Sequence, residues 1–253
     1  MKKKDNEEEG CFVAFVLLSE NRWDKNKFLA DFEKDWGFEL STESNDDAIV
    51  AKVGGMTLCV AIMPAPVPHQ EAEHNAAANY LWKGAVDAAK NHQAHLLISV
   101  IGREMGTLGK GKLFTKAVSS CLKQQNATAV YTDGAVFEPT FYIDFAEEMK
   151  EDPDALPIFD WVWFGIYHTE KLSGIYTYGM KKFGKEEIEV YADADLNDIR
   201  GFLYDMVYYI LSEDVTLKDG ETIGFSEEQK LDITYSKGIA LDGKTLKIEY
   251  PNE

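Results

Sequence analysis

Cations, cysteines and long apolar runs are all scarce in this chain of 253 residues. Only 26 lysines and arginines stand against 44 aspartates and glutamates, which gives a formal net charge of −18. Such a surface would repel a nucleic-acid backbone or an anionic membrane, because phosphate contacts need clustered cations. We therefore expect neither of these partners, whereas a basic protein partner is compatible with the charge.

The three cysteines, Cys11, Cys59 and Cys121, are far apart and form no CxxC pair. This usage fits a reducing compartment better than a disulfide scaffold. The early apolar run CFVAFVLL is far shorter than the ~20 residues of a membrane span, and the SENRW that follows offers no small-residue cleavage site. We expect a cytoplasmic protein.

The apolar rhythm alternates between strand and helix types, which predicts an α+β fold. We expect strands at CFVAFVLL, MTLCVAIM (56–63) and HLLISVI, the first and last of them buried, and helices capped by Asp24 and Asp195. The order β-α-β-β-α-β over residues 11 to 101 is that of a ferredoxin-like unit, and a bridging helix follows over about 112–124. The same order then returns, followed by a β-rich tail. We predict two ferredoxin-like βαββαβ pseudo-repeats packed as one body. The expected parts are a disordered segment over 1–10, a first unit over 11–125 and a second unit over 126–253.

Four of the five histidines lie between residues 68 and 100, with two glutamates nearby. Two histidines four apart on a helix can bind zinc, but His69 and His74 are five apart and would point in different directions. Glu71 and His74 have the spacing of half a di-iron site, yet no second Glu-x-x-His occurs. The alternative is a long helix over about 71–92 whose acidic first turn meets the helix dipole. We expect that helix and no metal.

The segment GTLGKGKL, residues 106 to 113, is a second candidate site. Gly106, Gly111 and Lys112 have the G-x-x-x-x-G-K spacing of a phosphate-binding loop, but Leu113 replaces the serine or threonine that would hold magnesium. The glycines also suit an ordinary surface loop before a helix. An anion contact at Lys110 and Lys112, beside a helix N-terminus, remains open.

Other catalytic patterns are incomplete. No G-x-S-x-G elbow occurs, and each cysteine falls at an apolar position where thiols are inert. Only tertiary structure could bring Cys59 or Cys121 to His168. Glu187 and Glu189 alternate with Ile188 and Val190, which predicts a solvated strand face for both carboxylates. We therefore predict no catalytic residue and no cofactor.

Aromatic residues gather in FDWVWFGIYH and YDMVYY. Trp161 and Trp163 alternate with Val162 and Phe164, so both faces of this expected strand are apolar, which is typical of a central strand beneath helices. If one side were instead open, it would offer a surface to a protein partner. We expect core.

The second half of the chain resembles a known family. The segments YTYGMKKFGKEEIEVY (176–191) and LKDGETIGFSEEQKLDITYSKG (217–238) resemble the bacterial family catalogued as domain of unknown function 4261. Looser likeness extends upstream to PAPVP, the helix with Trp82 and the pair Phe141-Tyr142. The resemblance implies no activity or cofactor. Its glycines have structural explanations, Gly220 as a turn residue and Gly179 and Gly184 at a bulge or strand break.

These observations favour a non-catalytic module that binds another protein, of the kind an acidic inhibitor or immunity protein represents. The alternative is a protein or enzyme that binds a nucleotide or phosphometabolite through the 102–112 segment and the residues Gly106, Lys110, Gly111 and Lys112. A third, metal-dependent hydrolase chemistry would use His69, Glu71 and His74.

Overall fold

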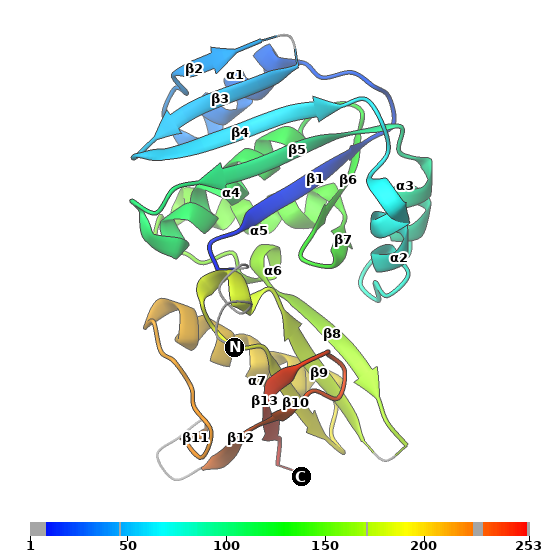
Figure 1. Cartoon of the computed structure of the whole chain (residues 1–253), viewed down its shortest axis with the longest axis vertical. Coiled ribbons are helices and arrows are strands. Elements are labelled where there is room, and N and C mark those ends of the chain that lie inside the picture. The colour runs from blue at the N-terminus through cyan, green and yellow to red at the C-terminus, as the bar shows by residue number, and fades with distance from the viewer. Residues whose placement is uncertain (1–8, 46, 171, 225–229, 252–253) are drawn as a thin grey trace. The chain divides into compact units, whose positions relative to one another are not determined.

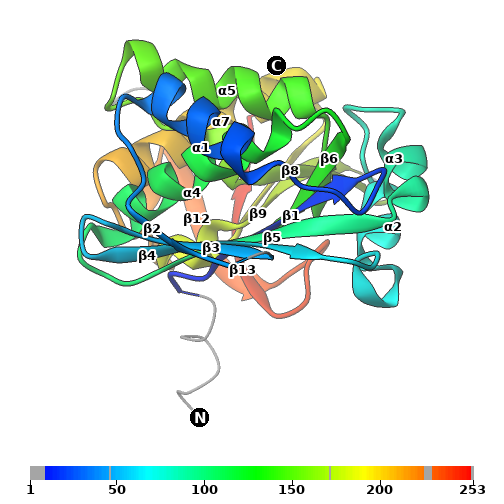
Figure 2. The ribbon, with the colours of Figure 1, turned by 90° about the horizontal axis from the view of Figure 1, so that it is seen from above.

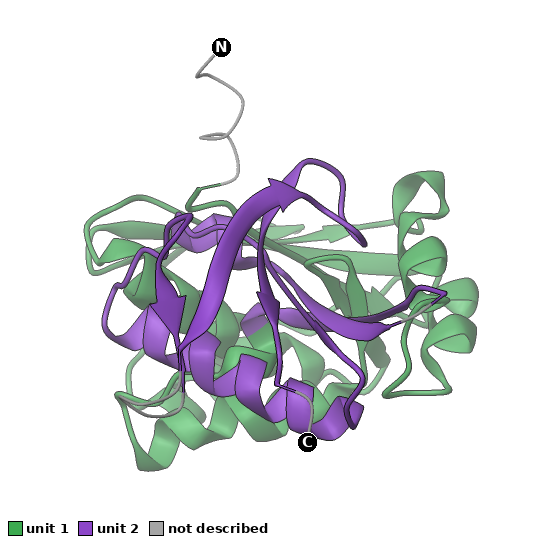
Figure 3. Ribbon diagram, turned by 90° about the horizontal axis from the view of Figure 1, so that it is seen from below, with its two compact units in different colours: residues 1–160 green, residues 161–253 purple. Residues whose placement is uncertain are grey.

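The structure, a computed structural model, describes residues 9–45, 47–170, 172–224 and 230–251 (Figure 1). The chain divides into two compact units, residues 1–160 and residues 161–253 (Figure 3). Each unit combines a sheet with helices, so the predicted α+β class is confirmed. Apart from residues 9 and 10, the segment expected to be disordered lies outside the described residues. None of the described helices is long and apolar enough to cross a membrane.

Unit 1 contains a seven-stranded antiparallel sheet with the strand order β2-β3-β4-β5-β1-β6-β7. Its elements are β1 (Phe12–Leu18), α1 (Lys25–Trp36), β2 (Thr42–Ser44), β3 (Ala48–Val53), β4 (Met56–Met63), the 3-10 helix η1 (Pro68–Gln70), α2 (Glu71–Ala76), α3 (Ala85–Asn91), β5 (Ala94–Ile101), α4 (Gly106–Leu122), β6 (Ala127–Thr132), β7 (Ala135–Phe137) and α5 (Pro139–Glu151). The short helix α6 (Ile158–Trp161) spans the boundary between the units.

Alternation along the strands builds the core between the unit 1 sheet and the helices that cover one of its sides. Every second residue of β1 and β5, and Met56, Leu58 and Val60 of β4, are buried on the side of the sheet that α1, α4 and α5 cover (Figure 2). Helix α1 begins where the sequence predicts, because the Asp24 carboxylate accepts the Lys27 N–H at 2.9 Å. It ends at Gly37, whose φ of 73° closes the last turn. Local signals therefore place these elements correctly.

The prediction of one long helix over residues 71–92 is wrong. Two short helices, α2 and α3, occupy its ends, and residues 77–84 form a loop between them. The Asn79 side chain accepts the backbone N–H groups of Leu81 and Trp82, at 2.8 and 2.9 Å, and so fixes the non-helical turn. The two helices pack against the β1, β6 and β7 end of the sheet through a cluster that includes Leu17, Ala129 and Val136.

Unit 2 contains a six-stranded sheet with the order β11-β12-β13-β10-β9-β8. The β10–β13 pair is parallel and the other pairs are antiparallel. Helix α7 packs against β9 and β10 through an apolar side. The elements are β8 (Trp163–His168), β9 (Ser173–Tyr178), the 3-10 helix η2 (Met180–Phe183), β10 (Ile188–Ala192), α7 (Leu196–Ser212), β11 (Thr222–Ile223), β12 (Leu231–Lys237) and β13 (Lys244–Glu249).

The two ferredoxin-like βαββαβ pseudo-repeats are not confirmed. In the first expected repeat, β5 lies between β4 and β1, whereas the ferredoxin-like order places the first strand between the third and the fourth. In the second expected repeat, the first strand and helix are β6 and α5, which belong to unit 1. The expected boundary after residue 125 therefore differs from the observed division after Asp160. The boundary lies later because β1 pairs with β5 on one side and with β6 on the other, so β6 joins the sheet of unit 1.

Candidate functional site

The residues of the expected phosphate-binding loop lie in a helix. Gly106, with a φ of 66°, is the first residue of α4, and Lys110, Gly111 and Lys112 lie inside the helix. The Lys110 amino group donates to the Gly10 carbonyl at 2.9 Å, and the Lys112 amino group donates to the Pro153 carbonyl at 2.6 Å. In this structure the two lysine amino groups of the expected loop therefore bond to backbone carbonyls of Gly10 and Pro153.

The three residues of the alternative metal site, His69, Glu71 and His74, do not form such a site in the structure. His69 lies in η1 with a φ of 59°. The Glu71 carboxylate accepts the Tyr131 hydroxyl at 2.7 Å, while a His74 ring nitrogen bonds the Gln70 carbonyl at 2.8 Å. Among the described residues, no three histidine, cysteine, aspartate or glutamate side chains are placed to hold one metal ion.

Two buried histidines instead fix the connection between β4 and η1. One ring nitrogen of His92 accepts the Val67 N–H at 2.8 Å, and the other bonds the Ala89 carbonyl. His95 bonds the Ala65 carbonyl at 2.9 Å. The pKa of His95 is lowered, mainly because the ring is buried. The hydrogen bond to Ala65 raises this pKa and the nearby His92 lowers it, but burial has the largest effect. These imidazoles hold backbone in place, which explains their position in the sequence.

The thiols are also separated. Cys11 is exposed, Cys59 is half-buried on β4, and Cys121 is buried in α4, where burial raises its pKa well above the ordinary value. The fifth histidine, His168, bonds the Ser173 hydroxyl at 2.9 Å in the other unit.

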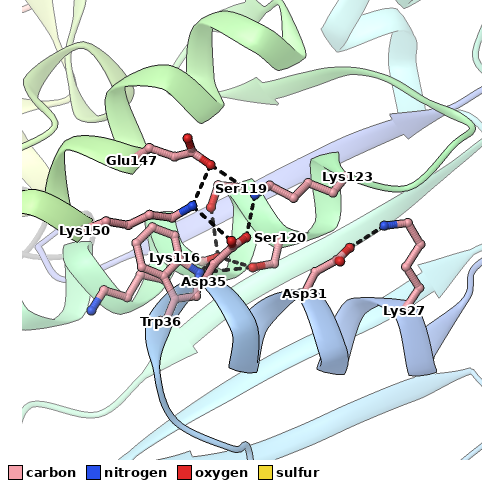
Figure 4. Close-up of polar contacts among 10 residues, drawn as sticks. All are labelled: Lys27, Asp31, Asp35, Trp36, Lys116, Ser119, Ser120, Lys123, Glu147 and Lys150. Atoms are coloured by element: carbon pink, nitrogen blue, oxygen red, sulfur yellow. Dashed lines mark hydrogen bonds and ion pairs between the residues drawn. The ribbon is translucent and has the colours of Figure 1, made fainter.

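Four charged side chains form a closed network on the helical side of unit 1 (Figure 4). The charge ring consists of Asp35 of α1, Lys123 just after α4, and Glu147 and Lys150 of α5. Each lysine contacts both carboxylates: Lys123 lies 2.5 Å from Asp35 and 3.1 Å from Glu147, and Lys150 lies 3.0 and 2.7 Å from them. Burial raises the pKa of Asp35, but hydrogen bonds and charges of the two lysines outweigh it, so the pKa is lowered.

The indole of Trp36 lies beside Lys150 of the charge ring. The Trp36 N–H donates to the Lys116 carbonyl and the Ser120 hydroxyl, both at 3.2 Å. The amino groups of Lys116 and Lys150 lie 5.3 and 5.6 Å from the centre of the indole ring, within cation–π range. The charge ring and the indole thus join α1, α4 and α5, which is a structural role.

Glu187 and Glu189 are buried, contrary to the solvated face expected from the sequence. One Glu187 oxygen accepts the N–H groups of Gly179 and Met180, both at 2.9 Å, and the other accepts the Thr177 hydroxyl at 2.7 Å. Burial raises the pKa of Glu187 to about 7, although the hydroxyl and the N–H groups lower it. A Cβ at Gly179 would lie 2.5 Å from the Trp161 carbonyl oxygen, so only glycine fits the turn that Glu187 holds.

Glu189 holds a second turn in the same manner. Its carboxylate accepts the N–H groups of Ile239 at 2.9 Å, Ala240 at 3.0 Å and Leu241 at 3.3 Å. A Cβ at Gly238 would lie 2.2 Å from the Leu241 carbonyl oxygen, so the close approach of this turn requires glycine. The Glu-rich strand and its neighbouring glycines are therefore fold requirements, as the sequence indicated for Gly179.

One face of the unit 1 sheet offers a surface of a different kind. We call it the open face: eight uncharged side chains on the side away from α1, α4 and α5. In Figure 1 the strands that carry these side chains, β1, β3, β4 and β5, lie in front of those three helices. Val50 and Ile101 are 37% and 61% exposed, and the other members are half-buried. The members are Val13, Val50, Thr57, Cys59, Ala61, Leu97, Ser99 and Ile101.

Strand register places these side chains in rows. Val50 lies opposite Cys59, Cys59 opposite Ser99, and Ser99 opposite Val13, so one row crosses β3, β4, β5 and β1. Side chains that lie directly opposite each other in antiparallel strands share one face. Charged members of the same strands stand only at the edge, Glu43 of β2 and Lys52 of β3, both exposed. The centre of the open face is therefore uncharged.

The sequence did not indicate this surface. Both CFVAFVLL and HLLISVI predict fully buried strands, yet alternate residues of β1 and β5 remain partly exposed. The available signal was the small or polar character of alternate positions in β4, namely Thr57, Cys59 and Ala61.

Of the two aromatic clusters for which core was expected, Trp161, Trp163 and Phe164 are buried, which confirms that part of the prediction. Phe159 is half-buried, and Tyr208 and Tyr209 of YDMVYY are exposed, so the prediction is wrong for these residues.

Comparison with known proteins is confined to unit 2. Residues 176–249 match the model of the family described as Domain of unknown function (DUF4261), which confirms the resemblance for this part of the chain. The match includes Glu187, Glu189 and their two glycine turns, and the open face lies outside it. No curated protein and no solved structure matches the chain.

Proposed function

We propose that the chain is a non-catalytic protein-binding module and that the open face is its contact surface. The observation that supports this most is the neutral, partly exposed row Val50, Cys59, Ser99 and Val13 at the centre of a sheet. Contiguous exposed apolar patches mark interaction sites in proteins, and the centres of interfaces are depleted of charge.

The partner has a positive net charge and an apolar contact face. The open face spans four strands and three rows of side chains, which cover roughly 300–400 Å² by the usual strand spacings. A standard interface takes about 800 Å² from each partner, so the contact extends beyond the open face onto its surroundings. The chain carries a net charge of −18, which attracts a cationic partner and repels a second copy.

The non-catalytic part of the proposal rests on how the candidate groups are used. Glu187, Glu189 and His92 are bonded to backbone N–H groups, and Lys110 and Lys112 to backbone carbonyls. Groups that stabilise turns in this way are not aimed at a common reactive centre. The nucleotide-binding alternative has no comparable support.

The test places one charge at the centre of the open face. Ser99→Lys is compared with Ala30→Lys, which makes the same charge change at an exposed position of α1. Each variant is used to capture proteins from a native lysate, and the affinity for the captured protein is then measured after purification. We expect wild type and Ala30→Lys to bind a protein of positive net charge, and Ser99→Lys to bind it about tenfold or more weakly.

Equal binding by all three proteins, with unchanged melting temperatures, overturns the proposal. So does sedimentation that shows a dimer of wild type dissociated by Ser99→Lys, because the occupant of the open face would then be a second copy.

A further inference from the structure

Helix α7 has two sharply different sides. Its inner side is buried in unit 2 through seven apolar residues: Ile199, Phe202, Leu203, Met206, Val207, Ile210 and Leu211. Its outer side exposes two tyrosines, Tyr208 and Tyr209, at 43% and 48%. Tyrosine is enriched in the energetically important centres of protein interfaces, and this exposed pair is available to a partner.

A glycine stands in the middle of this outer side without a structural reason. Gly201 is exposed, its φ is not positive, and a Cβ built on it would meet nothing within 4 Å. Glycine in a helix interior destabilises the helix relative to alanine. By contrast, a Cβ at Gly109 of α4 would lie 2.7 Å from the Met105 Cβ. The space beside Gly201 is thus open, and a side chain at this position would not clash with the chain itself.

Acidic and aromatic positions flank Gly201 along the same side of the helix. Asp198 and Asp205 lie three residues before and four residues after Gly201, and Tyr208 lies seven after it, so all share one side of the helix. Neither aspartate forms an ion pair with a cation within the part of the chain that the structure describes. Arg200 is the one cation of the α7 sequence, and its guanidinium bonds the Asn197 side chain at 2.9 Å.

We infer that the outer side of α7 binds an arginine-containing segment of the partner, whose backbone approaches the helix at Gly201. This inference rests on the proposed protein-binding function and names the chemistry of the partner at a second surface. A guanidinium can pair with Asp205 while it stacks on Tyr208 or Tyr209, one turn further along the helix. Glycine at position 201 permits that approach because it has no side chain.

Asp198 alone has a simpler explanation, since an acidic residue in the first turn of a helix interacts favourably with its dipole. That explanation does not account for Gly201, which weakens the same helix. Two substitutions at this position separate folding from binding.

The experiment measures stability and binding of Gly201→Ala and Gly201→Leu, with Ala30→Leu on α1 as the matched exposed control. The probe is an oligo-arginine peptide, titrated at physiological salt and followed by NMR on the labelled full chain. We expect both Gly201 variants to melt about 2–4 °C higher than wild type, because the helix gains propensity. We expect wild-type shifts to concentrate on residues 198–212 and Gly201→Leu to weaken the peptide about tenfold.

Unchanged peptide affinity in Gly201→Leu, or shifts spread evenly over acidic residues of both units, overturns the inference. The same variants are then tested on the protein captured through the open face. If Ser99→Lys loses binding to that protein and Gly201→Leu keeps it, the proposed function is supported and this inference is overturned. Loss on both supports both.

Discussion

The two units hold carboxylates in opposite ways. In unit 1, Asp35 and Glu147 each face two lysine ammonium groups in the charge ring, at a partly exposed position between helices. In unit 2, Glu187 and Glu189 are buried and face backbone N–H groups of two turns. The first arrangement neutralises a charge with a charge, while the second surrounds a carboxylate with uncharged donors.

The difference shows in how the groups titrate. The lysines lower the pKa of Asp35 and of Glu147. Neutral donors do not compensate fully for the loss of water around Glu187, and its pKa rises to about 7. Acid is therefore expected to weaken the charge ring and to favour the turn at Gly179. Three substitutions test this comparison.

The largest effect is expected for Glu189→Ala. It removes the acceptor of three backbone N–H groups in the 239–241 turn and leaves a cavity under them. We expect the free energy of unfolding to fall by about 3–4 kcal/mol, measured by urea denaturation. Glu249→Ala, at an exposed position of the neighbouring strand β13, is the control and should change it by less than about 0.5 kcal/mol. Similar losses in both variants would show that Glu189 does not hold the turn.

A pH-dependent effect is expected for Glu187→Gln. The folded pKa of about 7 lies above the ordinary 4.5, so the folded state binds more protons between these values. The stability that Glu187 contributes is fully present below pH 4.5 and is lost as the pH rises through 7. We expect wild type to lose about 2–3 kcal/mol of stability relative to the Glu187→Gln variant across this range, measured by urea denaturation at each pH. A difference between the two proteins that stays constant from pH 4.5 to 8 would contradict a raised pKa.

The smallest effect is expected for Asp35→Asn. Because the charge ring is partly exposed, its contribution to the free energy of unfolding is limited. We expect Asp35→Asn to lower that free energy by about 1 kcal/mol at neutral pH. The folded pKa of Asp35 is lowered below 3.8, so this contribution is present above that value and is lost as the pH falls through the folded pKa. A double-mutant cycle with Lys123→Met isolates the pair. A coupling energy of zero would mean that Asp35 and Lys123 are merely neighbours.

Much of the local structure could be predicted from the sequence. The Asp24 cap, the strand at residues 56–63 and the turn glycine Gly220, with a φ of 79°, are all found as expected. The long helix over 71–92 could not be excluded locally, because an alanine-rich stretch gives little sign of where it ends. Its break depends on one side chain, Asn79, that caps the following turn.

The surfaces and buried polar groups were much harder to predict. The alternation of Glu187 and Glu189 with apolar residues is typical of a half-solvated strand, and it held no information about the turns that cover the carboxylates. The donors for Glu189 lie some 50 residues further along the chain. The open face was missed although β4 carried a weak signal, the small or polar residues Thr57, Cys59 and Ala61 at alternate positions. The apolar residues at the matching positions of β1 and β5 look the same whether or not a helix covers them.

The sequence by itself determined the α+β class, the starts of α1 and α7, the acidic charge and the resemblance of the C-terminal part, because these depend on neighbouring residues or on totals. Only the tertiary structure decided which face of the unit 1 sheet stays uncovered, and which donors each carboxylate meets. The groups responsible come together across gaps such as the 88 residues between Asp35 and Lys123, and a chain brings such groups together only when its layers pack.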